Sequence, residues 1–246
     1  LRVGPNSQKL DRNKIVSFVQ AEGRVRFDEF VKLDIDIERT LDRKKFDRYL
    51  SLGKISNVLP ANEILINLNC AVENINAIHF NNAGILFFAS NPMKYIPQAQ
   101  VICALYKGIE KEKVLDRKDL TGDMITIIDE AVMFLEKHLN LSYEITGLQR
   151  KEILEIPETA IREAIVNAVC HRDYFEKGAN VMVEIFDDRV EISNPGALPS
   201  GLSKEDFGKR SMTRNPVIAS MLHRISYIEK MGTGITRMKK ACREAG

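Results

Sequence analysis

The spacing of apolar residues places the tightest constraint on how this chain can fold. From Met124 to Leu139, apolar residues recur every three or four positions, which predicts a helix with one face in a core. From Val181 to Ile192 they alternate with polar residues on both sides of Asp187-Asp188, which predicts a β-hairpin. A chain that combines both patterns with 44% hydrophobic residues is expected to form a globular α/β fold.

Further helices and strands are expected on both sides of these segments. Helical spacing is present at residues 15–19, 42–52, 60–68, 157–171 and 216–222. Pro60, Pro157 and Pro216 stand where a first helical residue is favoured. Short apolar and branched runs predict buried strands at residues 85–88 and 100–106.

Composition excludes several classes of protein. The longest apolar run, residues 83–89, is far shorter than the ~20 residues of a membrane span. A zinc finger is excluded because the cysteines lie far apart without a CxxC pair. We expect all four to be buried, in a cytoplasmic protein: Cys70, Cys103, Cys170 and Cys242. Because the chain begins at Leu1 rather than Met, we also expect it to be part of a longer protein.

Positive charge gathers near the C-terminal end. The whole chain carries a net charge of +2, but residues 200–246 hold ten Lys and Arg against four Asp and Glu, a local charge of +6. This asymmetry favours an anionic partner there, either nucleic acid or the phosphates of a nucleotide. A solvated basic helix face is the alternative.

One polar stripe on a predicted helix carries residue types that could do chemistry. Within residues 157–171, Glu163, Asn167 and His171 recur at i, i+4 and i+8, away from the apolar face. A carboxylate, an amide and an imidazole therefore share one ridge. The alternatives are a solvated polar stripe and, for His171, a simple helix C-cap.

A glycine pair precedes a further predicted helix, in which Ile235, Met238 and Cys242 lie at helical spacing. Gly232-Thr233-Gly234 would let the backbone approach an anion closely, at the helix end that favours phosphate. The triplet alone is also common in plain loops, and it matches neither the Walker A nor the Rossmann pattern. Its place after a Glu/Asn helix, a hairpin ending in Asn194-Pro195-Gly196 and a loop of lid length favours a phosphate site.

Five runs of residues together resemble a known family. They are Arg162-Glu163-Ala164-Ile165-Val166-Asn167-Ala168, His171-Arg172-Asp173-Tyr174, Glu191-Ile192-Ser193-Asn194-Pro195-Gly196, Arg214-Asn215-Pro216 and Gly232-Thr233-Gly234-Ile235. Residues 157–246 resemble the C-terminal domain of prokaryotic proteins described as RecG-related ATP-dependent helicases or transcriptional regulators. That domain is a divergent member of the GHKL, or Bergerat-fold, ATPases.

The resemblance implies a domain plan. Residues 1–30 would be a linker and helix after a missing upstream domain, and residues 31–118 an α+β connecting region. Residues 119–246 would form a GHKL-like (Bergerat) α/β sandwich that binds ATP. A Schlafen-type, Alba-like domain outside this chain would contact DNA.

The resemblance also implies a role for each motif residue. Glu163 would be the general base for hydrolysis, and Asn167 would offer its oxygen to Mg²⁺. His171 belongs to the same cofactor-binding set. The adenine would be held at Asn194 and Gly196, the phosphates at Gly232, Thr233 and Gly234, and residues 197–230 would be the ATP lid.

The expected function is therefore Mg-ATP binding within a DNA-associated transcriptional regulator, with slow hydrolysis as an open question. Asn194 replaces the usual Asp of the adenine motif, and the second glycine of that motif is missing. These departures keep a degenerate scaffold for protein interaction or homodimerisation as the alternative. Strand unwinding is not expected, because the chain has no Walker A run.

Overall fold

A computed structural model describes most of the chain. The described residues are 2–3, 6–7, 25–74, 77–139, 141–146, 149–198, 202–203, 205–206, 212–228 and 234–245. Three parts of the predictions lie outside the described residues. They are the helix predicted at residues 15–19, the pair Gly232 and Thr233, and much of the expected lid.

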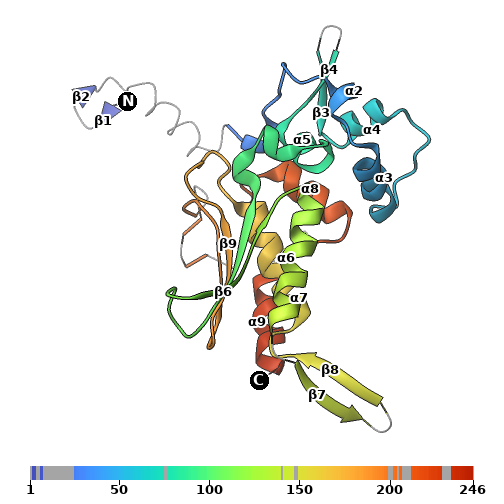
Figure 1. The fold of residues 1–246 in the computed structure, drawn as a ribbon. Coiled ribbons are helices and arrows are strands. Elements are labelled where there is room, and N and C mark those ends of the chain that lie inside the picture. The colour runs from blue at the N-terminus through green and yellow to red at the C-terminus, as the bar shows by residue number, and fades with distance from the viewer. Residues whose placement is uncertain are drawn as a thin grey trace.

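A mixed four-stranded sheet forms the centre of the fold (Figure 1). Its strand order is β10-β9-β5-β6, with β5 and β9 parallel and the other neighbours antiparallel. The strands are β5 (Val101–Tyr106), β6 (Val114–Leu120), β9 (Val181–Ile185) and β10 (Val190–Ser193). Helices α6 (Met124–His138) and α7 (Glu158–His171) lie against this sheet, so the predicted α/β fold class is confirmed.

The structure describes further helices and strands outside this sheet. They are β1 (Arg2–Val3), β2 (Asn6–Ser7), η1 (Phe27–Glu29), α2 (Ile37–Thr40), α3 (Arg43–Leu52), α4 (Ala61–Asn67), β3 (Ala71–Asn74), β4 (Ala77–Phe80), α5 (Asn82–Phe88), η2 (Pro92–Lys94), η3 (Pro97–Ala99), β7 (Leu141–Thr146), β8 (Gln149–Leu154), α8 (Pro216–Arg224) and α9 (Gly234–Ala245). One continuous cluster of buried side chains runs from Ile35 to Ile225. The sheet contains strands from both sides of the domain boundary expected between residues 118 and 119. The division of the chain into domains at this boundary stays a prediction.

Several predicted elements are confirmed with their caps. Asp42 caps α3 by accepting bonds from two backbone N–H groups. Asp123 caps α6 by accepting a bond from one backbone group, Thr126 N–H. In α6 the residues at helical spacing, from Met124 to Leu135, form a buried face. Of the helices in the described part of the chain, none has the length and apolar character of a membrane span.

The strand predicted at residues 85–88 is wrong, because these residues belong to α5. Asn81 caps this helix, its side-chain oxygen accepting a bond from Gly84 N–H at 2.9 Å. Every residue of α5 is buried and all but Asn82 are apolar, so the helix shows no helical period. Only glycine fits at position 84, because the Cβ atom of any other residue would overlap the carbonyl oxygen of Cys70.

The cysteine prediction holds for three residues and fails for one. Cys70, Cys103 and Cys170 are buried free thiols. Cys242 is exposed, because it lies on the outer side of α9.

Candidate functional site

The stripe on α7 brings two of its three polar residues into direct contact. Asn167 Nδ2 donates a hydrogen bond of 2.9 Å to Glu163 Oε1. The Glu163 side chain is only 13% exposed, so this carboxylate is held in place rather than solvated. With Nδ2 engaged in this way, the amide oxygen Oδ1 of Asn167 is the end that can face a cation.

The start of α9 lies against the same carboxylate. Gly234 is the first residue of α9, and a Cβ atom there would overlap Glu163 Oε1 and lie 2.5 Å from Cδ. In the first turn of α9, Arg237 Nη2 donates to Glu163 Oε2 at 3.3 Å. Only glycine fits at Gly234 with Glu163 in this position.

These groups suit a phosphate ligand and its metal ion. The half-exposed Arg237 guanidinium and the amino end of α9 both favour an anion. Among the residues that the structure describes, no group of three or more His, Cys, Asp or Glu side chains could hold a metal ion by itself. Mg²⁺ usually keeps several waters and is bound through few protein oxygens together with substrate phosphates, so one amide oxygen at Asn167 fits that ion.

The turn at Asn194-Pro195-Gly196 lies at the end of β10, with Asn194 exposed. Its backbone is tied to the end of α7, since Asp173 N–H donates to Pro195 O at 2.9 Å. Gly196 has a φ of +113°, and a Cβ atom there would lie 2.7 Å from Arg214 Nη1 and 2.8 Å from Asp173 Cβ. Both the conformation and the close approach therefore require glycine.

Arg214, near the middle of the expected lid, fixes this turn. Its Nη1 pairs with Asp173 Oδ2 at 2.6 Å, and its Nη2 donates to the carbonyl oxygen of Ala197. The positive charge of Arg214 acts on His171 as well, where burial first and then this charge lower the pKa of the imidazole. His171 is therefore held in its neutral form, near the turn and Arg214.

The remaining motif residues hold the framework of the site. Asn215 Nδ2 donates to the carbonyl oxygens of Cys170 at 2.8 Å and Arg172 at 2.9 Å, which caps the end of α7. The fully buried Arg172 donates to three more carbonyl oxygens, those of Asp173, Glu176 and Ala179. The His-Arg-Asp-Tyr and Arg-Asn-Pro runs thus interlock by hydrogen bonds, which spacing along the sequence does not reveal.

Sequence reasoning also missed Asp28, a buried residue far from these motifs in the chain. Its Oδ2 accepts bonds from Val217 N–H at 2.6 Å and Ile218 N–H at 3.1 Å, so it caps the start of α8. Burial raises the pKa of Asp28 to about 6 against the lowering effect of these two bonds. No signal in the sequence could have paired Asp28 with α8.

The C-terminal part of this α/β chain is similar to a known family. Residues 178–246 match a family described as "Putative ATP-dependent DNA helicase recG C-terminal". No curated protein matches the sequence.

A solved structure supports the fold. The DIP2311 protein from Corynebacterium diphtheriae is similar over 98% of this chain, with a TM-score of 0.71 and 20% sequence identity. This chain spans 47% of that protein. At this identity the likeness establishes the arrangement of helices and strands, and the site rests on the contacts above.

Proposed function

We propose that the chain is the Mg-ATP-binding module of a larger protein, with a GHKL-like site formed by α7, the start of α9 and the turn after β10. The observation that carries the proposal is the direct contact between Glu163 and Gly234. It places a carboxylate, an amide and a glycine-opened helix end at one point, as ATP phosphates and a bound cation require.

Each residue would then have a distinct role. Asn167 Oδ1 would be a ligand of Mg²⁺, which when bound neutralises charge on the phosphates. Arg237 would contact a phosphate, and Glu163 would orient and deprotonate water if ATP is hydrolysed. Gly232 and Thr233 complete the proposed phosphate loop.

The base of the nucleotide would lie at the turn after β10. An amide at Asn194 can accept a hydrogen bond from the adenine amino group through its oxygen. Gly196 would permit close approach of the base, and His171 in its neutral form adds a second acceptor nearby.

The wider setting of the module is part of the same proposal. Exposed basic residues follow Arg237 along α9, and they support an anionic partner at this end: Lys239, Lys240 and Arg243. We assign DNA contact mainly to a domain outside this chain, in a cytoplasmic transcriptional regulator. A homodimer is an additional state that the module could adopt.

A direct titration tests the proposal. Isothermal calorimetry with ATP, with and without Mg²⁺, should give Mg-dependent binding by the wild-type chain. Asn167→Ala should weaken the Mg-dependent part, while the matched control Asn67→Ala, at an exposed position on α4, should not. If the wild-type protein does not bind ATP with or without Mg²⁺, the result would favour the scaffold alternative.

A further inference from the structure

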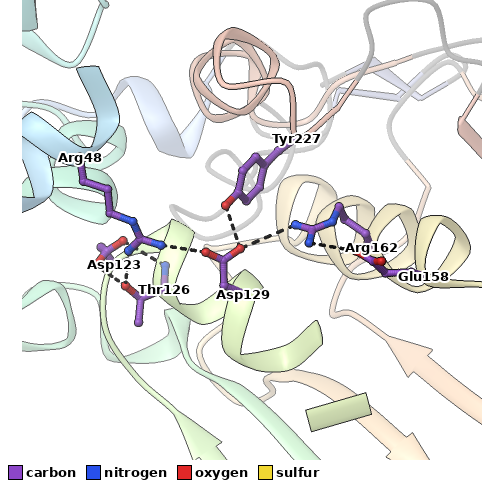
Figure 2. Close-up of polar contacts among 7 residues, drawn as sticks. All are labelled: Arg48, Asp123, Thr126, Asp129, Glu158, Arg162 and Tyr227. Atoms are coloured by element: carbon purple, nitrogen blue, oxygen red, sulfur yellow. Dashed lines mark hydrogen bonds and ion pairs between the residues drawn. The ribbon is translucent and has the colours of Figure 1, made fainter. Parts of the chain in front are cut away.

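Asp129 on α6 is the meeting point of three other parts of the chain (Figure 2). Its Oδ2 pairs with Arg48 Nη2 at 2.7 Å, and its Oδ1 accepts a bond from Tyr227 Oη at 2.8 Å. Arg162 Nη1 lies 3.7 Å from the same Oδ1. One carboxylate therefore joins α3, α7 and the chain after α8.

The partners are themselves held in fixed orientations. Arg48 Nη1 also donates to Thr126 Oγ1 at 3.0 Å, so its guanidinium contacts α6 at two residues, Thr126 and Asp129. Arg162 lies over the ring of Tyr227, with 5.6 Å between the guanidinium carbon and the ring centre. Figure 2 shows these side chains converging on Asp129 from separate elements.

Both partners on the C-terminal side are near residues of the proposed nucleotide site in the sequence. Arg162 directly precedes Glu163 on α7, so its anchorage limits rotation of the helix that carries the site ridge. Tyr227 lies three residues after the end of α8 and seven residues before Gly234, the first residue of α9. Arg48 belongs instead to α3, in the N-terminal part of the chain. Of these three residues, only Tyr227 lies within residues 178–246, which match the family.

We propose that Asp129 is a positioning residue for the nucleotide site, which it links to α3 through Arg48. This inference rests on the proposed ATP-binding function. Asp129 itself touches no part of the proposed ligand. It acts by keeping Arg162 and Tyr227 in one arrangement, so that the ridge of α7 and the start of α9 meet.

The experiment uses variants that delete single contacts. Tyr227→Phe removes only the hydroxyl, Arg48→Met removes the link to α3, and Asp129→Asn removes the central charge. The matched control is Lys118→Met, which breaks a 2.8 Å ion pair between Lys118 and Glu130, the next residue on α6. Each variant is titrated with Mg-ATP, and hydrogen exchange of α7 and α9 is followed without nucleotide.

Tyr227→Phe, Arg48→Met and Asp129→Asn should each weaken Mg-ATP binding about 3- to 10-fold, within the range of known coupling effects. In the Asp129→Asn background, Tyr227→Phe should have little further effect, because both act through one carboxylate. Each of the three single variants should also speed hydrogen exchange in α9. The control Lys118→Met should change neither Mg-ATP binding nor exchange in α9.

Two results would overturn the inference: exchange in α9 that is unchanged by Tyr227→Phe and Asp129→Asn, or the same response in the Lys118→Met control. Wild-type protein that binds no Mg-ATP would instead refute the proposed function. The exchange measured without nucleotide decides the positioning role in either case.

Discussion

Glu163 on α7 and Gly234 at the start of α9 are in contact, with no room between them for a single methyl group. A carboxylate thus lies at the amino end of a helix, where the helix dipole favours negative charge. Arg237 adds a donor to the same carboxylate. Any phosphate bound at this helix end must share these partners with Glu163.

The first prediction concerns this contact. Gly234→Ala should lower the free energy of unfolding by about 1–3 kcal/mol, because the added methyl group overlaps Glu163 Oε1. In a Glu163→Ala background the same change should cost little, since the overlapping atoms are gone. Chemical denaturation of the four proteins of this cycle measures the coupling. Equal costs of Gly234→Ala in both backgrounds would contradict the observed approach.

The second prediction separates binding from hydrolysis. Glu163→Gln keeps the size and the acceptor oxygen of the side chain but removes its basicity. If the chain hydrolyses ATP, the rate should fall about 10²- to 10⁴-fold while Mg-ATP affinity changes little. Phosphate release assays should show no such loss for Glu158→Gln, at the exposed start of the same helix. Hydrolysis at the wild-type rate by Glu163→Gln would remove Glu163 from the reaction.

The third prediction concerns the turn after β10. Gly196→Ala should cost about 1–3 kcal/mol from backbone conformation at a φ of +113°, with a further loss from contact with Arg214. Gly108→Ala is the control, because Gly108 has a φ of +84° and nothing within 4 Å of an added Cβ atom. Thermal unfolding should therefore rank Gly196→Ala as clearly worse. Similar losses for the two variants would mean that Arg214 moves aside freely.

The fourth prediction is a pH dependence of stability. Asp28 has a pKa of about 6 in the fold against 3.8 for an ordinary Asp, so the folded chain binds this proton more tightly than the unfolded chain. The contribution of Asp28 to stability is then fully present below pH 4 and is lost as pH rises to 6. The loss is at most about 3 kcal/mol, from the size of the shift.

Denaturation curves between pH 4 and 7 check this contribution. Asp28→Asn cannot titrate, so its stability should fall less steeply across this range than that of the wild type. Asp187→Asn, at an exposed turn, should follow the wild-type slope. Parallel curves for wild type and Asp28→Asn would show that the buried carboxyl keeps its ordinary pKa.

Local patterns in the sequence account for much of the fold. The helices α3, α6 and α7 and the β9–β10 hairpin were predictable, because each buries one face and so displays its period. Helix α5 was misread as a strand because a fully buried helix and a buried strand have the same apolar composition. Strand β6 gave no signal, since this edge strand is mostly exposed and charged.

The candidate site was predictable only where its residues are close in sequence. The spacing of Glu163 and Asn167 predicted that they share one ridge of the helix, and in the structure their side chains are also hydrogen-bonded to each other. The approach of Gly234 to Glu163 and the cap that Asp28 provides for α8 depend on tertiary packing. Such contacts join residues far apart in the chain, and no local period encodes them.

The bond between Arg214 and the carbonyl oxygen of Ala197 joins the two residues that flank residues 198–213. The start of α8 is held from outside this stretch, by the bonds that Asp28 accepts from Val217 N–H and Ile218 N–H. Because each doubling of loop length costs only about 0.6 kcal/mol, the stretch can be lengthened, shortened or exchanged at small thermodynamic cost.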